Sequence, residues 1–143
     1  MLPEAIELVI VTPTRELVRA RAREVTLPGA NGYLGVLPGH APLMTELGIG
    51  KLAFRGAAQA EPLSVIRGFA EVLPDRVTVL AETAELAAEI DLERAEAAKA
   101  RAEKRLAEKD PNIDWDRASV ALERALIRIQ VARKYRGVRE NFH

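Results

Sequence analysis

His40 is the residue of this chain whose type and setting most suggest chemistry. It lies in the segment GYLGVLPGHAPLMTELGIG, residues 32–50, which holds five of the nine glycines and two of the eight prolines. As a general base, His40 would need a carboxylate to orient its ring, and Glu46 is merely the nearest one in the sequence. A histidine in a loop rich in proline and glycine more often shapes a turn, so we expect a structural role for His40.

The sequence lacks the other patterns that carry catalysis or bind a metal. It contains no cysteine, and His143 is the one histidine besides His40, so we expect neither a nucleophilic cysteine nor a metal site. GIGKLA, residues 48–53, has Gly-Lys but neither the Ser/Thr nor the earlier glycine of a phosphate-binding loop. The 21 basic residues equal the 21 acidic residues, which gives no indication of a nucleic-acid partner. No apolar run approaches the ~20 residues of a membrane span, so no direct membrane insertion is expected.

The chain that must position these residues begins with a β-rich half. Residues 5–83 contain short β-branched segments separated by glycine and proline, such as RVTVLAE at 76–82. In this segment Val77 and Val79 face one side of a strand, and Leu80 faces the other. Many short strands with such turns predict a β-sandwich or a barrel.

The second half has a different composition and period. From about Glu85 it is rich in Ala, Glu, Lys and Arg, which favour helix, and Asp110-Pro111 would end a first helix. A short loop would make two helices antiparallel neighbours. The expected bounds are 1–86 for the β domain and 87–143 for a helical hairpin, with helices at about 91–108 and 114–136.

Apolar residues three and four positions apart give each helix a seam for the other. The seam would comprise Ala95, Ala98, Ala102 and Leu106 on the first helix, and Trp115, Ala118, Leu122, Ala125, Ile129 and Ala132 on the second. Because alanine has little area to bury, and burial stabilises by ~25 cal/mol per Å², we expect the hairpin to open more easily than the β domain unfolds.

The second helix is strongly basic. From Arg117 onward it carries seven arginines and lysines against two glutamates, in a chain without net charge. One interpretation is a solvated face with cations near a helix C-terminus, and the other is a surface that binds an acidic partner.

IDLERA, residues 90–95, and IDWDRA, residues 113–118, open the two expected helices with one shared pattern. Asp91 and Asp114 suit the N-cap position, where a carboxylate accepts a hydrogen bond from a backbone N–H near the start of the helix. Since capping explains both copies, the pattern alone does not establish a binding site.

Three segments together resemble the epsilon subunit of F-type ATP synthase: GYLGVLPGHAPLMTELGIG, then VIRGFAEVLPDRVTVLAETAE, then IDLERA. Their order and spacing match over essentially the whole chain. The resemblance implies an N-terminal β-sandwich followed by a C-terminal antiparallel α-helical hairpin. It implies that the loop region docks on the ring of c subunits, with nearby faces on the gamma subunit, through Tyr33, Leu37, His40 and Pro42. Tyr33 stands where many relatives carry an acidic residue, and Arg67 replaces a commoner glycine.

The resemblance also implies a role. The family is not catalytic: it couples proton flow to ATP synthesis and restrains ATP hydrolysis, as a peripheral subunit on the cytoplasmic face of the bacterial plasma membrane. Its extended hairpin meets acidic segments of the catalytic alpha and beta subunits, here through Arg124, Arg128, Arg133 and Lys134. An adaptor or chaperone with a β domain and a coiled arm is the alternative, which would share the periodicity but not the segment at 32–43.

Some relatives bind ATP in the folded hairpin, and the resemblance implies ATP as a regulatory ligand, with no cofactor required. The matching motif residues are Ile90, Asp91, Arg94 and Ala95, with further matches at Glu85, Arg124 and Arg128. In an antiparallel hairpin with a loop near 109–113, Arg94 and Arg128 are about equally far from the loop, so we expect their charges to converge on one triphosphate.

Overall fold

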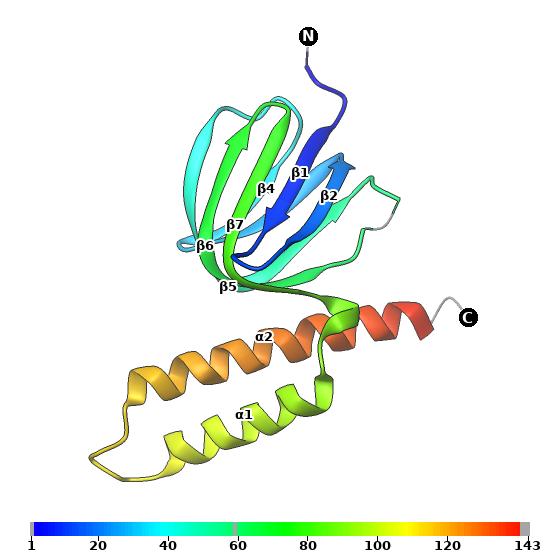
Figure 1. Ribbon diagram of the computed structural model, residues 1–143. Helices are drawn as coiled ribbons and strands as arrows, with labels where there is room; N and C mark the ends of the chain where they lie inside the picture. The colour runs from blue at the N-terminus through cyan, green and yellow to red at the C-terminus, as the bar shows by residue number, and fades with distance from the viewer. Residues whose placement is uncertain (1, 59, 141–143) are drawn as a thin grey trace. The chain divides into compact units, whose positions relative to one another are not determined.

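The structure is a computed structural model that describes residues 2–58 and 60–140. The chain forms two compact units, Met1–Leu86 and Ala87–His143 (Figure 1). None of the described helices is long and apolar enough to cross a membrane.

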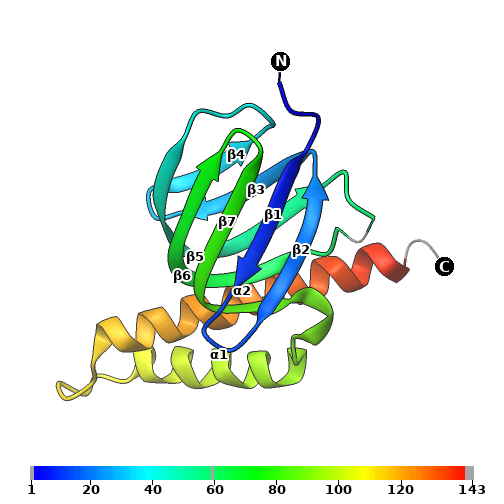
Figure 2. The same cartoon turned by 45° about the horizontal axis from the view of Figure 1, so that its top comes forward.

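The first unit is a β-sandwich whose strands belong to one hydrogen-bonded sheet (Figure 2). The strands in the described residues are β1 (Ile6–Val11), β2 (Glu16–Ala22), β3 (Glu24–Gly29), β4 (Gly32–Val36), β5 (Leu43–Arg55), β6 (Leu63–Leu73) and β7 (Arg76–Leu86). Their order across the sheet is β2-β1-β7-β6-β5-β3-β4. β1 and β7 pair in parallel, and the other neighbours pair antiparallel.

The three long strands, β5, β6 and β7, change the side that they turn toward the core partway along their length. On β7 the core residues Val77, Val79 and Ala81 follow the predicted alternation, but the next core residue is Ala84, three positions on. Because successive residues of a strand point to opposite faces, an odd step requires a local distortion. Such bends let long strands pass from one layer of a sandwich to the other.

In β6 the distortion lies at Arg67 and Gly68, whose φ angles are 58° and 138°. A Cβ at Gly68 would come closer to the carbonyl oxygen of Leu80 than real Cβ atoms come to any atom, so this position requires glycine. Arg67 holds a left-handed conformation that side chains other than glycine adopt at a cost of roughly 1–2 kcal/mol. The pairing of β6 with β5 and β7 resumes in the same register beyond the distortion.

The second unit is an antiparallel helical hairpin. It consists of a short 3-10 helix, η1 (Ala87–Glu89), and two α-helices, α1 (Leu92–Ala107) and α2 (Trp115–Glu140). Asp91 and Asp114 cap the helices as predicted, since each carboxylate accepts a hydrogen bond of 3.0 Å from the backbone N–H three residues on. α2 continues four residues past the predicted end at Arg136, and Gly137 does not interrupt it.

The seam between α1 and α2 is built largely from alanine. Its buried members are Ala95 and Ala102 of α1, and Ala118, Ala125, Ile129 and Ala132 of α2. Trp115, which the sequence analysis placed at the end of the seam, is 46% exposed and lies beside Leu106 and Pro111 at the loop. Trp115 is the first residue of α2, so it lies at the loop end of the hairpin, beside the last turn of α1. The predicted fold class, a β-sandwich followed by a helical hairpin, is confirmed.

Candidate docking surfaces and nucleotide site

The loop around His40 is held by backbone hydrogen bonds. The His40 N–H donates to the Leu37 carbonyl at 3.1 Å, and the Gly39 N–H donates to the carbonyl of Pro74 in the β6–β7 turn at 2.8 Å. Gly39 has a φ of 88°, a left-handed conformation that favours glycine. The His40 ring approaches a backbone oxygen, with Nδ1 2.7 Å from the Ala41 carbonyl. This arrangement is that of a turn residue.

The same loop presents apolar side chains to solvent. Leu37 is 57% exposed, Pro42 is exposed, and Leu43 and Met44 at the start of β5 are exposed as well. Exposed apolar side chains that gather in one segment commonly mark a site of protein association. Leu37, His40 and Pro42 thus lie together in one short, backbone-fixed loop, which has the character of a docking element.

Tyr33 is placed differently. It lies near the opposite end of β4 from Leu37, about 13 Å away at 3.3 Å per residue. Its ring is exposed, and its hydroxyl accepts a hydrogen bond of 3.0 Å from the backbone N–H of Lys51 in β5. The ladder between β3 and β5 is interrupted between Thr26 and Gly29, so the tyrosine hydroxyl supplies an acceptor beside this gap. This structural role of Tyr33 is one that the sequence analysis did not predict.

A second exposed apolar surface, which we call the Phe69–Leu80 face, was also not predicted from the sequence. Phe69 of β6 and Leu80 of β7 are directly paired and are 54% and 55% exposed. Val11 of β1 is the next residue in this row, opposite Leu80. The signal was present in the alternation, because Leu80 stands on the side of β7 that otherwise carries polar residues. Glu46, opposite Phe69 on β5, borders the row with a charge.

The candidate nucleotide-binding residues are split between the two units. Ile90 and Ala95 are buried, Arg94 is exposed, and the Asp91 carboxylate already accepts the Arg94 N–H as the cap of α1. On α2, Arg124 is exposed and Arg128 is half-buried. Glu85 belongs to the β-sandwich, where it pairs with Ser64 across β6 and β7.

Two contacts show which parts of the helices face each other. Arg133 of α2 forms an ion pair with Glu96 of α1, and the guanidinium of Arg136 donates to the Ile90 carbonyl at 3.3 Å. The start of α1 therefore faces the stretch of α2 around Arg133 and Arg136. Arg128 is five residues nearer the loop than Arg133, about 7.5 Å along the helix at 1.5 Å per residue. Arg128 therefore lies nearer the loop than the part of α2 that faces the first turn of α1.

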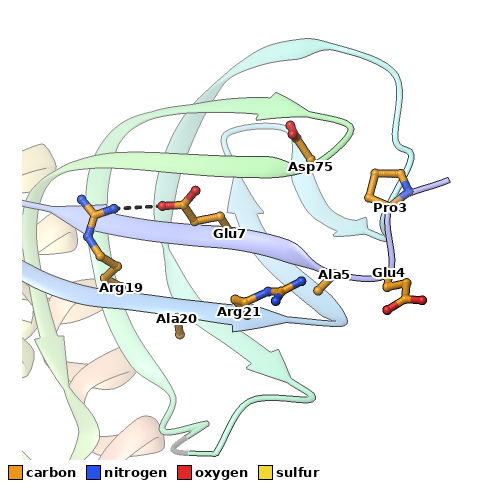
Figure 3. A pocket seen from close by; sticks show the side chains of 8 residues that line it. All are labelled: Pro3, Glu4, Ala5, Glu7, Arg19, Ala20, Arg21 and Asp75. Atoms are coloured by element: carbon orange, nitrogen blue, oxygen red, sulfur yellow. Dashed lines mark hydrogen bonds and ion pairs between the residues drawn. The ribbon is translucent and has the colours of Figure 1, made fainter. Parts of the chain in front are cut away.

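A surface hollow of about 640 Å³ lies at the N-terminal end of β1 (Figure 3). Two of its charged residues, Glu7 and Arg19, pair with each other: Glu7 accepts a hydrogen bond from Arg19 at 2.9 Å, and a second one from Arg76 at 3.2 Å. The hydrogen bond and the negative charge of Glu16 raise the pKa of Arg19 above its ordinary value. Across residues 2–58 and 60–140, no group of three or more His, Cys, Asp or Glu residues could hold a metal ion.

Comparison with known proteins gives consistent matches over both units. The family model "ATP synthase, Delta/Epsilon chain, beta-sandwich domain" matches residues 5–87, and the model of the long alpha-helix domain of the same chain matches residues 88–133. The ATP synthase epsilon chain of Syntrophobacter fumaroxidans is 45% identical over 131 residues, 92% of this chain and 98% of that one. That of Koribacter versatilis is 51% identical over 108 residues, 76% of each chain.

A solved structure shares the fold. A chain of the Euglena gracilis mitochondrial ATP synthase, in a structure of its OSCP, F1 and c-ring, aligns with a TM-score of 0.76 and 23% identity. The alignment covers 88% of this chain and 80% of that chain. From the family models and the identity to curated relatives, the chain belongs to the family of ATP synthase epsilon chains.

Proposed function

We propose that this chain is a rotor subunit that couples proton translocation to ATP synthesis and restrains ATP hydrolysis through its helical hairpin. As a member of the epsilon chain family it is not the catalytic subunit. The observation that carries the proposal is the division into a β-sandwich with exposed apolar surfaces and a separate hairpin closed by an alanine seam. One unit can then stay bound to the rotor while the other changes state. Neither the family match nor the structure offers support for an adaptor or chaperone outside the ATP synthase.

The two exposed surfaces of the sandwich suit two partners. We assign the Phe69–Leu80 face to the gamma subunit, because an apolar row bordered by a charge has the composition of a protein interface. We assign the loop with Leu37, His40 and Pro42 to the ring of c subunits. Tyr33 contributes its exposed aromatic ring to this contact with the c subunits, while its hydroxyl accepts a hydrogen bond from β5. The subunit would then be peripheral, on the cytoplasmic face of a bacterial plasma membrane.

The hairpin is the regulatory part of the proposal. When it extends, the basic residues of α2 meet acidic segments of the catalytic alpha and beta subunits; these residues are Arg124, Arg128, Arg133 and Lys134. When it closes, ATP binds against the first turn of α1, at Asp91, Arg94 and the neighbouring motif residues. A ligand that binds only the closed form shifts the equilibrium by about 2.7 kcal/mol at a hundredfold excess over its Kd. Because a seam made of alanines contributes little stability, a free energy of this size is enough to decide whether the hairpin is closed or extended.

Point variants of the full chain test the docking assignment. Replacing both Phe69 and Leu80 by serine should abolish capture by purified gamma subunit, while Leu37→Ser should leave gamma capture intact and weaken binding to the assembled ring. All three positions are exposed, so circular dichroism should show the fold retained in each variant. Gamma capture that survives the double substitution would move the gamma interface away from this face.

A further inference from the structure

We propose that Glu96 acts as an internal competitor for the inhibitory surface of α2. In the closed hairpin its carboxylate holds Arg133, and an acidic segment of the catalytic subunits must displace it before Arg133 can bind there. The inference rests on the proposed function, in which α2 meets an acidic partner. The new element is Glu96, which competes with the acidic partner for Arg133 and thereby sets the balance between the closed and the extended hairpin.

The contact joins the two helices directly. The Arg133 guanidinium and the Glu96 carboxylate form a hydrogen-bonded ion pair between positions 37 residues apart in the chain. Arg124 and Lys134, which belong to the same basic surface, are exposed and form no ion pair in the part of the chain that the structure describes. Arg133 therefore differs from these two neighbours in being occupied when the hairpin is closed.

The position of the pair gives it influence over opening. Glu96 lies 11 residues before the end of α1, about 16 Å from the loop at 1.5 Å per residue. Opening about the loop separates points far from it more than points close to it, so this pair breaks early. The Arg136 bond to the Ile90 carbonyl, farther still from the loop, reinforces the same end.

The Glu96–Arg133 ion pair is weak enough for another carboxylate to displace. Both side chains are partly exposed, 62% for Arg133 and 44% for Glu96, and the coupling of such pairs is small. An acidic partner that offers one or two further carboxylates can therefore displace it. Since the alanine seam adds little, a small coupling still shifts the balance between the two states measurably.

Thiol reactivity in the full chain tests the inference. The protein has no cysteine, so Ala102→Cys places a single thiol in the seam, where it reacts with a disulfide reagent only when the hairpin opens. In this background Glu96→Gln should speed the reaction between about 1.5-fold and about fivefold, the range of coupling for an exposed pair. Glu103→Gln is the matched control: it removes the same charge from α1, but Glu103 pairs with Lys99 of its own helix at 3.5 Å.

The charge swap, with Glu96→Arg and Arg133→Glu in one chain, should restore the protection that either single variant loses. Equal reactivity of the Glu96→Gln and Glu103→Gln chains would overturn the inference, as would a swap that restores nothing. In the reconstituted enzyme, Glu96→Gln should deepen inhibition of ATP hydrolysis, whereas Arg133→Gln should relieve it. A chain that opens more readily without deeper inhibition would leave the Glu96–Arg133 contact standing and would refute the inhibitory role of the extended hairpin.

Discussion

Tyr33→Phe separates the structural role of this residue from its role in docking. The substitution keeps the exposed ring and removes only the hydroxyl that accepts the Lys51 N–H at 3.0 Å. Lys51 is half-buried, and a backbone donor left without an acceptor costs about 1–3 kcal/mol. Since water can reach a half-buried N–H in part, we expect a loss near the lower limit, about 1 kcal/mol.

For a unit the size of Met1–Leu86, a loss of 1 kcal/mol lowers the melting temperature by roughly 4–8 °C. Scanning calorimetry of the full chain measures this shift, and amide hydrogen exchange locates it. The Lys51 amide should lose more protection than its neighbours in β5. Binding to the ring of c subunits should be unchanged, because phenylalanine keeps the aromatic side chain at position 33. An unaltered melting temperature together with an unaltered Lys51 amide would show that the hydroxyl is not part of the sheet.

Three further outcomes are expected. Gly68→Ala should destabilise the β-sandwich by several kcal/mol, seen in urea unfolding, because the new Cβ would collide with the Leu80 carbonyl; a loss below 1 kcal/mol would contradict the distortion described for β6. Arg94→Ala should weaken ATP binding at least tenfold in calorimetry while circular dichroism stays unchanged, and wild-type protein that binds no ATP at millimolar concentration would remove the nucleotide site. Neutralising three basic residues of α2 should raise ATP hydrolysis by the reconstituted enzyme without loss of assembly, and unchanged inhibition would refute the electrostatic contact. The three are Arg124, Arg128 and Arg133.

The general architecture could be predicted from the sequence because each of its signals is local. The two I-D-x-acid-R-A segments mark helix starts through the short reach of an aspartate to its own backbone, and both caps are present. Alternation in β7 follows from the opposite directions of successive side chains, and it holds through Ala81. The spacing of the alanines predicted the buried seam because residues three and four positions apart lie on one face of a helix.

The features that could not be predicted depend on contacts across the chain or on rare backbone geometry. Nothing in the residue type of Arg67 indicates a φ of 58°, which neighbouring strands impose on it. The Tyr33 hydroxyl reaches a donor 18 residues away, and only the arrangement of β3, β4 and β5 brings the two together. Whether Glu96 pairs with Arg133 depends on how far the two helices are shifted along each other. The spacing of the seam residues fixes that shift only to within about one helical turn.

The ion pair and the nucleotide act on the same equilibrium, and their combination reports the resting state of the hairpin. If ATP binds only the closed form, its apparent Kd is the intrinsic Kd divided by the closed fraction. A hairpin that rests closed has a closed fraction near one, so weakening the Glu96–Arg133 pair hardly changes the apparent Kd. A hairpin that rests open has a small closed fraction, and the apparent Kd then rises by the same factor as the opening equilibrium.

The structure has the hairpin closed, with Arg133 paired and the alanine seam buried. We therefore expect Glu96→Gln to raise the apparent Kd for ATP by clearly less than it raises the thiol reactivity at position 102. Calorimetry and thiol kinetics on the same preparations compare the two factors directly. A larger factor for the apparent Kd than for the thiol reactivity would mean that the isolated subunit rests open, because the thiol would then be accessible even with the pair intact, and that ATP, rather than the ion pair, supplies most of the free energy of closure.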